Sequence, residues 1–176
     1  MFNFVIQTEN ILKPQLNELT KLAKDTHIES KKYFVKLKNK PPKNLDYIMQ
    51  DLHDAEFKKT SCLDCANCCK TTGPMFTSAD IERISKHLKQ KPKQFIDKYL
   101  KIDEDKDYVL QQVPCNFLDQ DNSCFIYDVR PKACREFPHT DRKKFNQITD
   151  LTLINVAICP AAFNIVEKMK LKMPLL

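Results

Sequence analysis

Residues 62–69 read CLDCANCC, and this stretch holds four of the eight cysteines in the chain. Two residues separate Cys62 from Cys65 and Cys65 from Cys68, and such short spacers let successive sulfur atoms converge on one metal centre. Cys69 directly follows Cys68, and neighbouring side chains normally diverge from Cα atoms that are about 3.8 Å apart. We therefore expect Cys68 and Cys69 to serve different centres, or one of them not to be a ligand.

The four remaining cysteines are widely spaced. Each lies beside a proline, in a predicted turn or at a predicted helix start, where the backbone is constrained: Cys115, Cys124, Cys134 and Cys159. Eight thiolates match two tetrathiolate centres, either two zinc sites or one or two iron–sulfur clusters. The ferredoxin run CxxCxxCxxxCP does not occur. The sequence therefore predicts zinc or iron as the bound metal and all eight cysteines as ligands.

Two arginines, Arg130 and Arg135, flank Cys134. Four thiolates around Zn²⁺ or around a [4Fe–4S]²⁺ core leave a charge of about −2, which guanidinium groups that donate to the sulfur atoms would offset. The alternative is that both arginines form salt bridges at helix ends. His139 follows Cys134 by five positions, and its side chain is either a further ligand or exposed to solvent.

The composition is that of a globular protein: 176 residues, 42 % of them apolar and 30 % charged, with a net charge of +6. This length fits one domain, or one domain with a helical appendage. No apolar run approaches the roughly 18 residues of a membrane span, and the N-terminal MFNFVIQTEN lacks the basic leader of a secretory signal. We therefore expect a cytoplasmic protein without a membrane partner, whose cysteines bind metal rather than form disulfides.

The N-terminal part predicts two amphipathic helices. Apolar residues recur at helical spacing over residues 14–38 and again over 44–58, and Pro41 and Pro42 separate the two runs. We interpret residues 1–60 as a helical hairpin. A hairpin cannot bury both apolar stripes alone, so we expect it to pack on the cysteine-rich part or on another protein, including a second copy of the chain.

Residues 61–176 are predicted to form a metal-stabilised, cysteine-rich domain with a C-terminal helix. A cap at Thr77 or Ser78 predicts a helix over residues 78–90, and residues 108–113 read as a short strand. Prolines in first helical turns predict further short helices, which begin at Pro92, Pro131 and Pro160. The predicted fold class is mainly α with short irregular β segments and an N-terminal helical hairpin.

Residues 31–43, KKYFVKLKNKPPK, contain six lysines and no acidic residue. Such a run can contact phosphate groups or another anionic surface, but it is also typical of a solvated helix end followed by a linker. The hairpin alternates in charge through most of its length and lacks a clear aromatic stacking pattern. Nucleic acid is therefore not an expected partner.

Several segments together resemble a known family. They are CLDCANCC at 62–69, PCNFL at 114–118, CFIYDVRP at 124–131, CREFP at 134–138 and CP at 159–160. This pattern resembles the YkgJ-type cysteine-cluster family of zinc- or iron-chelating domains over residues 60–162. The resemblance implies metal chelation by the eight cysteines. One branch of that family includes flagellin lysine-N-methylases, suggested to carry an iron–sulfur centre, but this chain is short for that branch and its hairpin lies outside the shared region.

Three functions follow as hypotheses. The first is a metal-binding protein that coordinates zinc or an iron–sulfur cluster. The second is a metal-dependent modifying enzyme resembling the lysine-N-methylases, which would need an open coordination position at one centre. The third is a structural zinc module that presents the lysine-rich hairpin to nucleic acid or to a partner protein.

Overall fold

The computed structural model describes residues 16–174. The predicted helix start at residue 14 and the first fifteen residues of the predicted hairpin lie outside this range. Within it, nine α-helices accompany one small three-stranded sheet, so the predicted mainly α fold class is confirmed. None of the described helices is long and apolar enough to cross a lipid bilayer.

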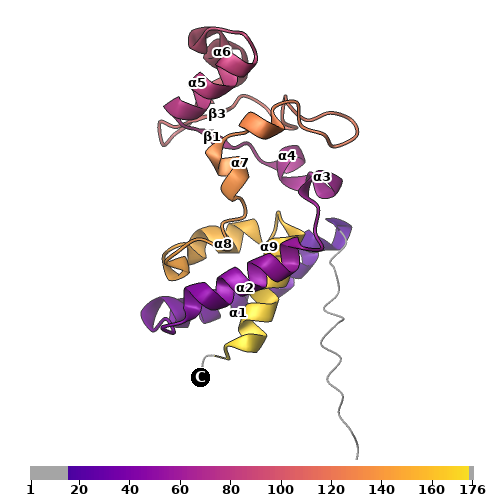
Figure 1. The fold of residues 1–176 in the computed structure, drawn as a ribbon. Helices are drawn as coiled ribbons and strands as arrows, with labels where there is room; N and C mark the ends of the chain where they lie inside the picture. Colours follow the sequence, from indigo (N-terminus) through magenta and orange to yellow (C-terminus); the bar gives the residue numbers. More distant parts are fainter. Residues whose placement is uncertain (1–15, 175–176) are drawn as a thin grey trace, which may run out of the picture. The chain divides into compact units, whose positions relative to one another are not determined.

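Contacts between residues divide the chain into two compact units (Figure 1). The first unit comprises the residues up to Thr60 together with those from Thr140 onward, and the second unit comprises Ser61–His139. The predicted domains, 1–60 and 61–176, and the two observed units both have a boundary between residues 60 and 61. The contacts group the C-terminal segment with the N-terminal helices, and the division into folding domains stays a prediction.

The first unit is a set of helices around an apolar core. The helices are α1 (Leu16–Asn39), α2 (Leu45–Phe57), a 3₁₀ turn (Phe145–Gln147), α8 (Thr149–Asn155) and α9 (Pro160–Lys172). Helix α2 packs on α9, and α1 packs on α8 and α9. Side chains of Leu37, Met49 and Phe145 are fully buried in this core. The C-terminal helices thus cover the apolar stripes of both N-terminal helices.

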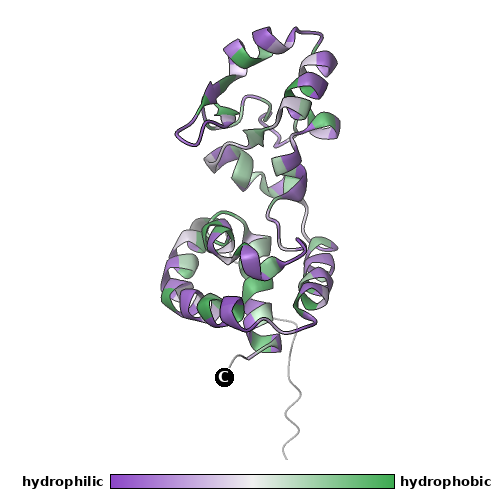
Figure 2. Cartoon of the chain, turned by 90° about the vertical axis from the view of Figure 1, so that its left-hand side faces the viewer, coloured by the Kyte–Doolittle hydropathy of each residue, from purple (hydrophilic) through white to green (hydrophobic). Residues whose placement is uncertain are grey.

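Helices α1 and α2 carry apolar and polar residues interspersed along their length (Figure 2). This is the pattern of a helix with one buried face. Helix α8 was not predicted, because it is only seven residues long and two of these are β-branched threonines. Glu56, which is 1 % exposed, accepts from Asn164 Nδ2 at 2.8 Å and pairs with Lys168 Nζ at 2.5 Å.

The second unit has short elements. They are α3 (Cys62–Cys65), α4 (Asn67–Thr71), β1 (Met75–Phe76), α5 (Ser78–His87), α6 (Pro92–Tyr99), β2 (Leu100–Ile102), β3 (Tyr108–Leu110), a 3₁₀ turn (Tyr127–Val129) and α7 (Lys132–Glu136). The sheet has the order β1-β3-β2 with both pairs antiparallel, and Leu100 lies opposite Leu110. Phe95 is fully buried and stacks on Phe117 with ring centroids 6.1 Å apart.

Several local predictions for the second unit are confirmed. Thr77 and Asp80 form a capping box at the start of α5, and Pro92 occupies the first turn of α6. The strand predicted over 108–113 ends at Leu110, so that prediction was too long. After β3, an isolated antiparallel bridge pairs Leu118 with Cys124.

Candidate metal centre

Two one-turn helices carry the CLDCANCC stretch. Ser61 caps the first of them by accepting a hydrogen bond from Asp64 N at 3.3 Å. Ala66 separates the helices with a left-handed backbone (φ 47°) although it is not glycine, and its side chain is buried. The sequence indicated a tight loop here, and the structure resolves it into a helix–kink–helix that presents four cysteines within two turns.

The long loop after β3 returns to this helix pair. Cys115 N donates to the Cys69 carbonyl at 2.8 Å, which fixes the start of the loop beside α4. Cys124 lies across the loop at the bridge with Leu118. A small cavity is lined by Cys68, Cys69, Cys115 and Cys134, and Pro74 and Phe137 add apolar walls. Four cysteines from three separate parts of the sequence therefore share one apolar cavity.

The thiols influence one another electrostatically. Burial raises the pKa of Cys134 to about 12, and the nearby thiols of Cys69, Cys115 and Cys124 add to this rise. Burial likewise raises the pKa of Cys115 to about 11, again with contributions from Cys69 and Cys124. Negative charge on any one of these sulfur atoms therefore opposes ionisation of its neighbours.

Cys69 contributes to the pKa shifts of several other cysteines. The pKa of Cys62 is raised by burial and then by Cys65, with a contribution from Cys69, and that of Cys124 is raised by burial with a contribution from Cys69. A hydrogen bond with Cys68 lowers the pKa of Cys69 itself to about 7. We call the following seven residues the cysteine cluster: Cys62, Cys65, Cys68, Cys69, Cys115, Cys124 and Cys134.

The two arginines differ in their surroundings. Arg130 stacks on Tyr127, with 3.9 Å from its guanidinium carbon to the ring centroid, and its Nη1 donates to the Tyr127 carbonyl at 2.7 Å. The positive charge of Arg130 also lowers the pKa values of Cys62, Cys124 and Cys134, although burial dominates each of them. Arg135 Nη1 donates to the Arg130 carbonyl at 2.6 Å. Arg130 thus lies near the thiols, and Arg135 contacts the backbone of Arg130.

The eighth predicted ligand, Cys159, belongs to the first unit. It precedes α9 as the N-cap residue, and its Sγ accepts a hydrogen bond from Ala162 N at 3.5 Å. His139 is the last residue of the second unit, has a left-handed backbone (φ 66°) and packs edge-on against Phe137. The structure therefore groups seven of the eight predicted ligands in one unit.

The donor set fits zinc or iron by its chemistry, since clustered thiolates are the ligands of structural zinc sites and iron–sulfur clusters. None of the eight cysteines, all of which lie in the described range, is in a disulfide. Among residues 16–174, no group of three or more His, Cys, Asp or Glu side chains is arranged so that it could hold a metal ion.

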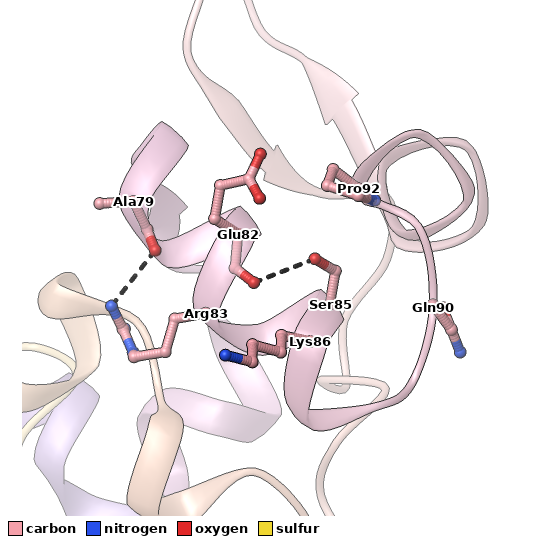
Figure 3. Close-up of a pocket in the computed structure, with 7 residues that line it drawn as sticks. All are labelled: Ala79, Glu82, Arg83, Ser85, Lys86, Gln90 and Pro92. Atoms are coloured by element: carbon pink, nitrogen blue, oxygen red, sulfur yellow. Dashed lines mark hydrogen bonds between the residues drawn. The ribbon is translucent and has the colours of Figure 1, made fainter.

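Sequence reasoning missed two residues at this site, Asp80 and Arg83. The Asp80 residue is 1 % exposed, and its carboxylate pairs with Arg83 Nη2 at 2.5 Å. Figure 3 shows the guanidinium group of Arg83 turned toward the Ala79 carbonyl and away from Gln90 and Pro92. The spacing of three between the acid and the arginine was the available signal.

These features define a class, namely mainly helical proteins with a cysteine-rich unit. Comparison with known families agrees with this class. Residues 61–152, more than half of the chain, match the model of the CxxCxxCC family, described as "Putative zinc- or iron-chelating domain". The chain belongs to the CxxCxxCC family, which confirms the resemblance seen in the sequence. No solved structure matches the chain.

Proposed function

We propose that this protein binds zinc or iron through thiolates of the cysteine cluster. The observation that carries the proposal is the small apolar cavity that Cys68, Cys69, Cys115 and Cys134 line from three separate parts of the sequence. Thiols this close repel one another once they are ionised, and a bound cation converts that repulsion into attraction. In this proposal the metal draws the sulfur atoms together, and all eight cysteines, including Cys159, remain candidate ligands.

Arg130 has the position to offset the negative charge of a thiolate centre, because its charge favours ionisation of three of the thiols. Arg135 would act through its hydrogen bond to the Arg130 carbonyl. The bound metal would supply either a structural brace or, as an iron–sulfur cluster, an electron carrier. Reduced thiols suit a reducing compartment, so we place the protein, a relative of the YkgJ-type proteins, in the cytoplasm.

The test is to isolate the full chain without oxygen and to measure zinc, iron and acid-labile sulfide per chain. Zinc without sulfide identifies a zinc site, and iron with equimolar sulfide identifies a cluster. We expect Cys69→Ser and Cys134→Ser to lose most of the metal. Phe125→Ser is the matched control, because Phe125 is exposed and adjacent to Cys124 but contributes no ligand. Metal content unchanged in both serine variants would refute the proposal.

Cys159→Ser tests the eighth position by itself. Metal loss in this variant would show that a residue of the first unit completes a centre. Full metal retention would restrict the ligands to the seven residues of the cysteine cluster. The enzymatic and nucleic-acid alternatives stay predictions, because no feature of the described residues favours either.

A further inference from the structure

An ion pair between the buried Asp80 and the partly exposed Arg83 holds the segment that leads to Cys134. Asp80 lies in the first turn of α5, and its two carboxylate oxygens have separate partners. Oδ2 accepts from Thr77 N at 3.0 Å and from Thr77 Oγ1 at 2.6 Å, which completes the cap of α5. Oδ1 accepts from Arg83 Nη2 at 2.5 Å and from Lys132 N at 3.1 Å. One oxygen therefore serves the local helix, and the other reaches 52 residues along the chain to the first residue of α7.

Arg83 extends the same connection. Its Nε donates to the Val129 carbonyl at 3.3 Å and its Nη2 donates to the Arg130 carbonyl at 2.9 Å. A planar guanidinium group can donate to several acceptors at fixed angles, which a lysine ammonium group cannot reproduce. Asp80 and Arg83 together thus bind the backbone of three residues in one short segment: Val129, Arg130 and Lys132.

That segment leads directly to the metal-binding thiols. Arg130 stacks on Tyr127 four residues before Cys134, and Lys132 begins the helix that carries Cys134. Helix α7 has only five residues, too few to be stable without external contacts. Its orientation therefore depends on contacts from elsewhere, and the bond from Asp80 fixes its first residue.

We propose that Asp80 and Arg83 are positioning residues of the metal centre, which set the placement of Cys134 and Arg130 through the segment 129–132. The inference rests on the proposed function. It adds to the metal site two residues that are not themselves metal ligands. A role limited to stabilising α5 would predict a different result, because the cap of α5 uses only Oδ2 of Asp80.

The chain offers variants that separate the two roles. Arg83→Met keeps the aliphatic stem and the cap of α5 but removes all bonds to residues 129 and 130. Asp80→Asn keeps the shape of the side chain and removes the charge. Thr77→Ala is the matched control, because it removes both cap bonds of the Thr77 hydroxyl and leaves both partners of Oδ1 in place. Arg83→Lys keeps the charge with fewer directed donors.

The measurement is the transfer of metal from the as-isolated full chain to a coloured chelator, with thermal unfolding recorded on the same samples. We expect Arg83→Met and Asp80→Asn to weaken metal retention by roughly 10- to 100-fold, the usual cost of losing a residue that orients a ligand. Arg83→Lys should fall between Arg83→Met and the parent chain. Thr77→Ala should lower the unfolding temperature and leave metal retention within about twofold of the parent chain.

Each outcome is decisive. Equal metal retention in Arg83→Met, Asp80→Asn and the parent chain overturns the positioning role while the proposed function stands. Metal loss in Thr77→Ala as large as in Arg83→Met also overturns it, because general destabilisation of α5 then explains the effect. A parent chain isolated without zinc or iron overturns the proposed function and this inference with it.

Discussion

The two units of the molecule are stabilised differently. Among the described residues of the first unit, fifteen buried apolar side chains form one core beneath long helices. In the second unit, the corresponding core has eight buried apolar residues, and seven cysteines lie in the same stretch of chain. A core of that size gives little stability to a unit of short helices and strands of two or three residues. From this difference we predict that metal bound by the thiols stabilises the second unit more than the first.

The largest expected effect comes from removing the metal. Structural zinc is worth about 10–16 kcal/mol in small peptides, comparable to the roughly 5–15 kcal/mol that stabilises a whole domain. Chelation should therefore remove hydrogen-exchange protection from residues 61–139 and leave it in α1, α2 and α9. A sample treated with chelator and then reloaded with metal is the control. An equal loss of hydrogen-exchange protection in both units would contradict the expected difference between them.

A matched pair of core truncations tests more sharply whether the two units are stabilised differently. Phe145 in the first unit and Phe95 in the second are both fully buried, and truncation to alanine costs about 3–5 kcal/mol in each case. Phe145→Ala should lower the free energy of unfolding and leave the metal bound. Phe95→Ala should lower both the free energy of unfolding and the metal content. Denaturant unfolding with metal content measured in parallel distinguishes them, and metal loss in Phe145→Ala would show that the units are coupled.

The pH dependence of metal binding is a smaller effect. The raised pKa values of Cys115 and Cys134, about 11 and 12, keep these thiols protonated at neutral pH, so metal binding must release their protons. Affinity should therefore increase as pH rises from 6.5 to 8.5, by about tenfold per pH unit for each proton released. Competition with a chelator of known pH dependence measures this. A pH-independent affinity would show that the ligands are already ionised.

The smallest effect is expected at the surface of the first unit. Tyr47 is 78 % exposed, so Tyr47→Ser should change the free energy of unfolding by no more than about 0.5 kcal/mol. Thermal unfolding and metal content should both match the parent chain. A larger destabilisation would reveal a contact of Tyr47 that supports the core.

Local features of the fold were predictable because their causes are local. The capping box of Thr77 and Asp80, the first-turn prolines of α6 and α9, and the break at Pro41 and Pro42 each act within a few residues. Helix α8 was missed because its short, β-branched sequence becomes helical only when it packs against α1 and α9.

By itself the sequence determined the chemistry of the donors: eight cysteines, a spacing that suits metal, and arginines beside one of them. Tertiary structure alone decided which donors share a unit, that Cys69 lies at the centre of their interactions, and that Asp80 bonds to a residue 52 positions away. The physical reason is the range of the interactions. Caps and prolines act on adjacent backbone, whereas burial and charge act through space between segments that only the folded chain brings together.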